Sequence, residues 1–181
     1  MGTLPGFPFQ IEPQQHRVRA QTGYNQWASM STQPTRTLKP LVGVVVVSHE
    51  QVAFSMLEAA RRVVGTLPGV TVACASAADD SAAITQRVAR ACSEVDDGAG
   101  VLIMVDVYGS TPFHVAMSML DGTGAAEVLC GVNLPMLLKL ATIDRTRISP
   151  AEMAQELCEA GRRAIRIGSE LTGKIDVGGN R

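Results

Sequence analysis

The feature that most constrains this 181-residue chain is an uninterrupted apolar run at residues 41–47, which reads Leu-Val-Gly-Val-Val-Val-Val. A strand with one face in water alternates apolar and polar residues, and this run shows no such alternation. It therefore predicts a strand that is covered on both faces, as in a parallel sheet flanked by helices. The polar residues Ser48, His49 and Glu50 end the run.

Apolar strands and helical patterns continue to alternate as far as residue 172. Further strands are predicted at Val70–Ala75, Gly100–Val105 and Ala126–Val132. Apolar residues at helical spacing predict four buried stripes: Phe54, Leu57, Ala60 and Val64; Ile84, Val88, Ala91 and Val95; Phe113, Met117 and Leu120; and Met153, Leu157, Ala160, Ala164, Ile167 and Leu171. A shorter helix is predicted to follow Asn133 and reach about Leu140.

This order of elements predicts an α/β fold, with an open, doubly wound parallel sheet and helices on both faces. We expect right-handed crossovers and the strand order 2-1-3-4. Ser149 and Pro150 are suited to begin the last helix, and Gly173 is suited to follow its end.

The charge of the chain is divided unevenly along it. The first 40 residues carry a net charge of +3 and five of the nine prolines, and the remaining residues carry −4. Residues 1–39 have no helical or strand periodicity, which predicts a flexible basic tail. A docking peptide built on Phe7, Phe9 and Trp27 is the alternative. The predicted domain spans residues 40–173, and a polar tail follows at 174–181.

Composition excludes several classes of function. The total charge of −1 lacks the basic excess of a nucleic-acid binder, and no apolar run reaches the ~20 residues of a membrane-spanning helix. The first segment has no apolar region of 7–15 residues, so we expect no secretory signal there. The four separated cysteines (Cys74, Cys92, Cys130 and Cys158) predict buried free thiols and a cytoplasmic protein. We expect no cofactor, no metal and at most a peripheral association with a membrane.

Two polar residues follow the first and third predicted strands, His49 and Asp106. In the order 2-1-3-4, the direction in which strands are added to the sheet reverses between the first and third strands. Open parallel sheets place their sites at such a point, beyond the carboxyl ends of the strands. His49 is suited to be a general base, a metal ligand or a nucleophile that carries a phosphoryl group. Asp106 would fix the imidazole tautomer. Strand-end or turn residues with local hydrogen bonds are the structural alternatives for both.

Gly109, Ser110 and Thr111 precede a predicted helix in which Pro112 is the first residue and Thr111 the N-cap. Free amides at a helix N-terminus attract anions, so these three residues are candidates to bind phosphate. An ordinary helix cap is the alternative. His114 is expected on the surface without a catalytic role, and His16 falls in the tail.

Three segments resemble the signatures of a known family in their order and spacing: residues 43–49, 105–113 and 131–137. The family is the mannose-type enzyme IIA domain of the bacterial phosphoenolpyruvate-dependent sugar phosphotransferase system. The resemblance covers about residues 41–172.

The resemblance implies that His49 accepts a phosphoryl group from a histidine phosphocarrier protein and passes it to a IIB domain or subunit during sugar uptake. It implies that Asp106 orients this histidine and that Thr111 and neighbouring amides hold the phosphoryl oxygens. It also implies a homodimer whose sheet gains an antiparallel edge strand, exchanged between subunits. The stretch after Thr142 or the C-terminus is expected to supply that strand.

Three residues depart from the family pattern. Glu50 replaces a usual glycine, Ser110 replaces a second glycine and His114 replaces an asparagine. We expect the Glu50 carboxylate to add negative charge beside the phosphoryl group and to slow docking or transfer. The departures suggest divergence in partner or role rather than loss of phosphorylation. A regulatory IIA-like protein, whose phosphorylation state is the output, is the alternative function. A relative of the phosphoryl-donor subunit for dihydroxyacetone phosphorylation is a third.

Overall fold

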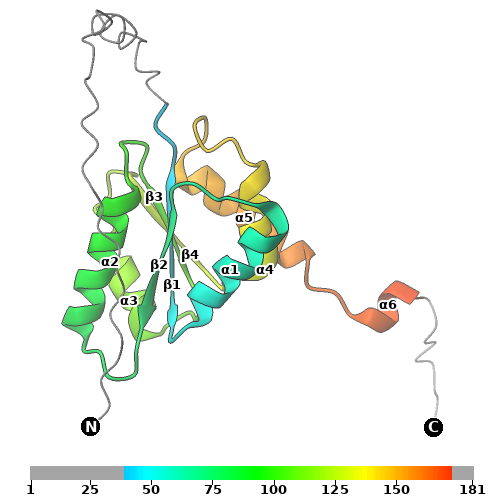
Figure 1. The fold of residues 1–181 in the computed structure, drawn as a ribbon, viewed down its shortest axis with the longest axis horizontal. Coiled ribbons are helices and arrows are strands. Elements are labelled where there is room, and N and C mark those ends of the chain that lie inside the picture. The colour runs from blue at the N-terminus through cyan, green and yellow to red at the C-terminus, as the bar shows by residue number, and fades with distance from the viewer. Residues whose placement is uncertain (1–38, 173–181) are drawn as a thin grey trace, which may run out of the picture. The chain divides into compact units, whose positions relative to one another are not determined.

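The computed structural model describes residues 39–172, which contain one four-stranded parallel sheet (Figure 1). The strands are β1 (Gly43–His49), β2 (Val70–Ala75), β3 (Val101–Val105) and β4 (Ala126–Cys130), in the order β2-β1-β3-β4. The helices are α1 (Val52–Val64), α2 (Ser81–Val95), α3 (Thr111–Met117), α4 (Leu134–Lys139), α5 (Pro150–Arg163) and α6 (Gly168–Thr172), with a 3-10 turn, η1, at Leu140–Thr142. The predicted fold class and strand order are confirmed.

The predicted tails, residues 1–39 and 174–181, lie outside the described residues except for Lys39.

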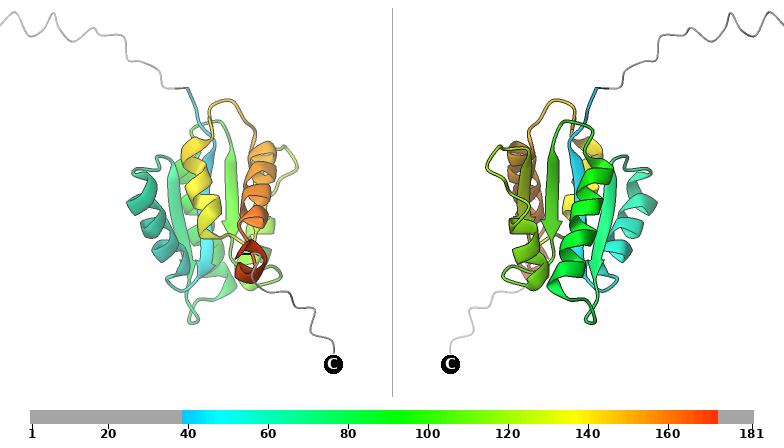
Figure 2. Two further views of the ribbon diagram at one scale, coloured as in Figure 1. Left: turned by 90° about the vertical axis from the view of Figure 1, so that its right-hand side faces the viewer. Right: turned by 90° about the vertical axis from the view of Figure 1, so that its left-hand side faces the viewer.

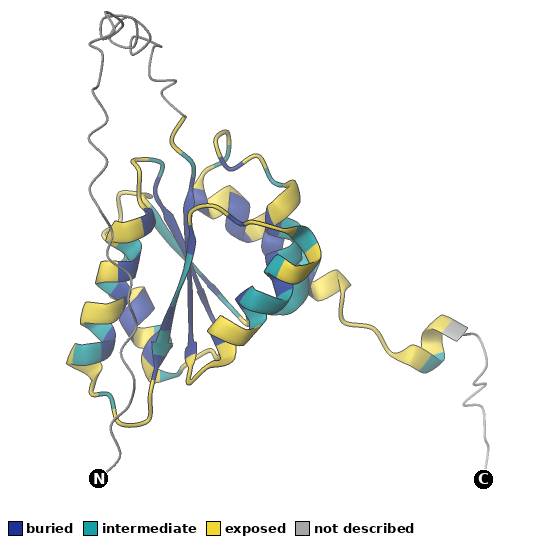
Figure 3. Ribbon diagram, viewed as in Figure 1, coloured by how far each residue is buried: buried dark blue, intermediate teal, exposed yellow. Residues whose placement is uncertain are grey.

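The sheet separates two apolar cores, and Figure 2 shows the helices that cover each of its faces. Val44 and Val46 point to the core that is shared with α1, α4 and α5. Val45 and Val47 point to the opposite core, which is shared with α2 and α3. All four valines are fully buried, and β1 has the colour of buried residues up to its exposed last residue, His49, when the ribbon is coloured by burial (Figure 3). The valine run is therefore covered on both faces, as its lack of alternation predicted.

Local sequence signals account for where two of the helices begin. The Asp80 carboxylate accepts a hydrogen bond from the backbone N–H of Ala83 at 2.7 Å and so caps α2. A reciprocal pair of hydrogen bonds between Ser149 and Glu152 forms a capping box at the start of α5. The predicted stripe of α2 is buried, and α5 begins at Pro150 as expected.

Two of the predicted stripes are wrong in part. Phe54 is 52% exposed, and the buried face of α1 instead consists of Ala53, Leu57 and Ala60. In α3, Met117 is exposed, and the buried residues are Pro112, Val115 and Ala116. In α1 the small side chains of Ala53 and Ala60 face the core and let the helix approach the sheet closely, so the largest apolar residue, Phe54, was a poor guide to the buried face.

The predicted last helix is too long. It ends at Arg163, and the chain then runs without regular structure to the short α6. Ile165, Ile167 and Leu171 are 76%, 60% and 68% exposed. The helical spacing of Ile167 and Leu171 continued the stripe of α5 in sequence, but no core lies under them.

A buried arginine ties the loop after α4 to the amino end of the sheet. The Arg145 guanidinium donates to the backbone oxygens of Val42, at 3.0 Å, and of Pro68. The backbone N–H of Val42 in turn donates to the Arg145 oxygen. Burial lowers the pKa of Arg145, but its hydrogen bonds satisfy the buried cation. Neither apolar periodicity nor a motif indicated this residue.

The close approach of α2 to β1 yields a test of the fold. A Cβ atom on Gly43 would lie 2.5 Å from the backbone oxygen of Val95. Gly43→Ala should therefore lower the free energy of unfolding by about 1–3 kcal/mol, as measured by urea denaturation followed by circular dichroism. Gly168→Ala is the matched control, since a Cβ there meets no atom within 4 Å. Equal stability of the two variants would contradict this packing.

Candidate active site

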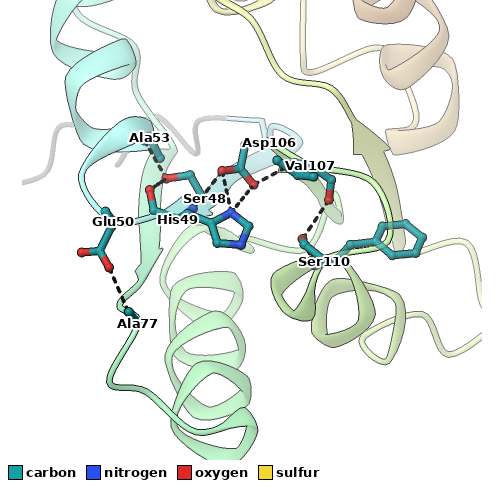
Figure 4. A network of polar contacts seen from close by, with 9 residues as sticks. Ser48, His49, Glu50, Ala53, Ala77, Asp106, Val107 and Ser110 are labelled. Atoms are coloured by element: carbon teal, nitrogen blue, oxygen red, sulfur yellow. Dashed lines mark hydrogen bonds and ion pairs between the residues drawn. The ribbon is translucent and has the colours of Figure 1, made fainter.

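His49 and Asp106 meet at the carboxyl edge of the sheet, where β1 and β3 end (Figure 4). The imidazole Nδ1 lies 3.0 Å from Asp106 Oδ2 and 3.2 Å from Oδ1. The backbone N–H of His49 also donates to Oδ2, at 2.9 Å, and that of Val107 donates to Oδ1, at 2.8 Å. One carboxylate therefore holds both the main chain and the ring of His49.

This contact decides which ring nitrogen is free. A carboxylate only accepts hydrogen bonds, so Nδ1 of the neutral ring is the donor and Nε2 keeps its lone pair. The Asp106 side chain is only 12% exposed, whereas the His49 side chain is 49% exposed. Nε2 is thus presented on an accessible ring, and it is suited to act as a nucleophile or a base.

Ser48 determines where the chain goes after the strand. Its buried hydroxyl accepts a hydrogen bond from the backbone N–H of Ala53 at 2.7 Å. This bond caps the first turn of α1 from the end of β1, since the N-cap residue Gln51 makes no side-chain cap. His49 is therefore held between a buried strand and a capped helix.

The N-cap of α3 is Ser110, and the predicted N-cap, Thr111, is wrong by one residue. The Ser110 hydroxyl accepts from the backbone N–H of Phe113 at 3.3 Å and donates to the oxygen of Val107 at 2.8 Å. Thr111 is then the first helical residue and Pro112 the second. Within residues 39–172, the Thr111 hydroxyl and N–H have no hydrogen-bond partner, whereas the Ser110 hydroxyl both donates and accepts a hydrogen bond.

A pocket of about 260 Å³ brings Thr111 and His49 to one space. It opens between the end of β1, the loop after β2 and the start of α3, and its lining residues are His49, Glu50, Ala75, Ser76, Ala77, Asp79, Ile84, Thr111 and Pro112. Gly109 has a φ of 77° in the turn that leads to α3, a conformation that glycine adopts readily.

Glu50 directs its carboxylate to the loop after β2. The Glu50 Oε1 atom accepts a hydrogen bond from the backbone N–H of Ala77 at 2.8 Å. The sequence predicts negative charge at this position beside the phosphoryl group, and the structure shows that the carboxylate has a specific partner on the pocket wall (Figure 4).

An ion pair stabilises the same loop, and no pattern in the sequence indicated it. Arg87 donates to both Asp79 carboxylate oxygens, at 2.6 and 3.0 Å. The Asp79 carboxylate also accepts from the N–H of Ser76 at 2.7 Å. The hydrogen bonds from Arg87 and Ser76 lower the pKa of Asp79 to about 2. The eight-residue separation of Asp79 and Arg87 is no recognised helical spacing.

Apolar side chains are exposed beside His49 and Asp106 in the chain. Val52 and Phe54 lie in the first turn of α1, and Val107 and Tyr108 follow Asp106. Between 46% and 79% of each of these residues is exposed. We call these four residues the apolar rim.

His114 is exposed and belongs to an aromatic cluster beside α3. The Phe113 ring lies 5.3 Å from the His114 ring and 4.9 Å from the Tyr108 ring. No hydrogen bond joins His114 to His49 or Asp106, as expected for a surface residue. His16 lies outside the described residues.

Among residues 39–172, no three His, Cys, Asp or Glu side chains form a group that could hold a metal ion. No helix in this part of the chain is long and apolar enough to cross a bilayer. The four cysteines are free and only partly buried. Burial raises the pKa of Cys92 to about 11 and also raises the pKa of Cys130, which disfavours the reactive thiolates.

Comparisons with known proteins bear on this site. The model of the family described as "PTS system fructose IIA component" matches residues 43–157. The "PTS system mannose-specific EIIAB component" of Escherichia coli K12 is 24% identical over 125 residues, which are 69% of this chain and 39% of that protein. The "PTS system fructose-specific EIIA component" of Bacillus subtilis is 19% identical over 135 residues, which are 75% of this chain and 92% of that protein.

Solved structures share the fold. The mannose/sorbose-specific IIA subunit of Enterococcus faecalis superimposes with a TM-score of 0.63 at 24% identity, over 70% of this chain and 94% of that one. The phosphotransferase component EIIA of Streptococcus agalactiae gives a TM-score of 0.64 at 20% identity, over 72% and 99%.

The ion pair on the pocket wall predicts a pH dependence. The pKa of Asp79 falls from 3.8 to about 2 on folding, so its charged form stabilises the fold above about pH 4. The free energy of unfolding of the wild type should exceed that of Asp79→Asn near neutral pH. The difference should disappear as the pH falls from about 4 to about 2. Urea denaturation at a series of pH values measures it.

The control is the same pair of proteins in an Arg87→Met background, where the largest cause of the lowered pKa is absent. The pH-dependent difference should shrink in that background. An unchanged difference would show that Arg87 is not its cause.

Proposed function

The chain belongs to the PTS fructose IIA component family, whose members are phosphotransferase components, and we propose that it carries a phosphoryl group on His49. It accepts the group from a histidine phosphocarrier protein and passes it to a IIB domain or subunit during sugar uptake. One observation carries the proposal: Asp106 binds Nδ1 of His49 and leaves Nε2 free, and His49 lines a pocket together with Thr111, whose hydroxyl has no partner among residues 39–172.

The proposed transfer is an in-line displacement at phosphorus. The Nε2 lone pair forms a new N–P bond while the N–P bond of the donor histidine breaks, and the donor imidazole leaves with that electron pair. Positive charge develops on the His49 ring, and the Asp106 carboxylate stabilises it through Nδ1–H. The Thr111 hydroxyl and N–H donate to the phosphoryl oxygens. The protein thus contributes positioning and charge stabilisation, which dominate phosphoryl transfer.

Donor and acceptor must both reach Nε2, so each must cover the same face of the domain. The apolar rim, which is close to His49 and Asp106 in the chain, offers exposed apolar area to bury, and this suits protein partners better than nucleic acid. We place the protein in the cytoplasm, at most peripheral to a membrane permease that carries the IIB partner.

We further propose a homodimer in which a second copy adds an antiparallel strand to β4. Among the described strands, β4 pairs only with β3, so its outer edge is unpaired. The segment 165–167, which has no regular structure, carries two exposed isoleucines. This favours it over residues 143–149, where Arg145 binds the loop to Val42. The segment from each subunit would pair with β4 of the other.

Labelling tests the proposed phosphorylation site. Incubation with phosphoenolpyruvate, enzyme I and the phosphocarrier should give an acid-labile phosphohistidine that His49→Ala lacks. Asp106→Ala should slow labelling by about 100-fold, because the ring loses its orientation. His114→Ala is the control and should label like the wild type, since His114 does not contact His49. Labelling of His49→Ala to the wild-type extent would refute the assignment.

Light scattering after size exclusion tests the dimer. The wild type should have twice the mass of one chain, and the double variant Ile165→Asp/Ile167→Asp should be monomeric, because charged side chains would be desolvated at the interface. Val63→Asp is the control, since Val63 is 69% exposed on α1 and should leave the dimer intact. A monomeric wild type would end the proposal.

A further inference from the structure

Glu50 adopts a backbone conformation that side chains normally avoid. Its φ is 45°, and among residues 39–172 it is the one non-glycine residue with a positive φ. The left-handed region brings Cβ close to the backbone carbonyl, so glycine is the residue that adopts it without strain. A glutamate is stable in this conformation only if the interactions of its side chain offset the strain energy of its backbone.

The surroundings of Glu50 supply that compensation. Its backbone N–H donates to the Ala75 oxygen at 2.7 Å and continues the ladder between β1 and β2. Its carboxylate accepts from the N–H of Ala77 at 2.8 Å. A hydrogen bond to a charged acceptor is stronger than one between neutral groups, and glycine would leave the Ala77 amide without it.

Consecutive residues of one turn are therefore bonded to opposite neighbours of β1 (Figure 4). His49 is bonded to Asp106, which follows β3, through its ring and its amide. Glu50 is bonded to the loop that follows β2. The turn that carries the nucleophile is thus held from both sides.

The loop that Glu50 holds is a wall of the pocket beside His49. Ser76, Ala77 and Asp79 line that pocket together with Thr111. The far end of the loop is already fixed by Asp79, which accepts from Ser76 and pairs with Arg87. The hydrogen bond from Ala77 to Glu50 connects this preassembled loop to the His49 turn.

We propose that Glu50 is a positioning residue for phosphoryl transfer. Its carboxylate accepts a hydrogen bond from the Ala77 amide and so fixes the pocket wall on the side of His49 opposite Asp106. This role rests on the proposed phosphorylation of His49. It reverses the expectation that the Glu50 charge slows transfer. The Glu50 oxygen acts as a hydrogen-bond acceptor for Ala77, and this bond speeds phosphoryl transfer. A wall held in place keeps the phosphoryl group aligned with Nε2.

Three variants separate the acceptor from the charge and from the backbone. Glu50→Gln keeps an oxygen that can accept from Ala77 and removes the charge. Glu50→Ala removes the acceptor and keeps the strained backbone, and Glu50→Gly removes the acceptor and relieves the strain. Full-length proteins are phosphorylated from phosphoenolpyruvate, enzyme I and a range of phosphocarrier concentrations, and amide exchange at Ala77 is followed by NMR.

At saturating phosphocarrier, Glu50→Ala and Glu50→Gly should both be phosphorylated roughly 10-fold more slowly than the wild type, with a nearly unchanged half-saturating concentration. Glu50→Gln should restore most of the rate. The Ala77 amide should exchange faster in the alanine and glycine variants alone. A merely structural role would not give a loss in rate at saturation that the glutamine variant rescues.

Glu50→Gly at the wild-type rate or faster would overturn the role, and so would a Glu50→Gln variant as slow as Glu50→Ala. If the wild type itself takes no label, the proposed function fails and this role fails with it. If the wild type takes label and the variants match it, this role alone fails.

Discussion

The burial of β1 on both faces is the constraint on which the rest of this structure depends. Four consecutive valines point alternately to two apolar cores, and each strand neighbour and covering helix is placed by the need to bury them. Burying one such side chain contributes about 1.5–3 kcal/mol, so no arrangement with a solvated face competes. The first polar side chains after the run therefore lie at the carboxyl edge of the sheet, at the end of an inner strand.

The position of these polar residues at the carboxyl edge explains why the candidate site is built from strand ends and the turns that follow them. Asp106 emerges beside His49 because β3 is the parallel neighbour of β1, and one carboxylate binds both the ring and the main chain of His49. Ser48 directs the chain into α1, and Glu50 binds the loop beyond the other neighbour, β2. The accessible ring is held by groups that are themselves hydrogen-bonded, which is the usual requirement for a preorganised site.

Much of this arrangement could be predicted because strands and motifs are local. The strand at Val70–Ala75 is predicted to the residue, and the strand at Ala126–Val132 is two residues too long because Gly131 turns the chain with a φ of 81°. The errors arise where packing against another element, and not the local sequence, determines which residues are buried. Phe54 continued a helical stripe, yet the sheet accepts the small Ala53, and the stripe of α5 continued past Arg163 with no core beneath it.

The sequence by itself determined the fold class, the strand order and the pairing of His49 with Asp106 at one edge, because apolar periodicity and the topology of parallel sheets act through neighbours in the chain. Only the tertiary structure decided which hydroxyl near α3 is free and where the charge of Glu50 goes. Those outcomes depend on hydrogen bonds to backbone groups up to 27 residues away, as from Ala77 to Glu50. Backbone donors carry no signature in the sequence, so their partners are known only once the loops are placed.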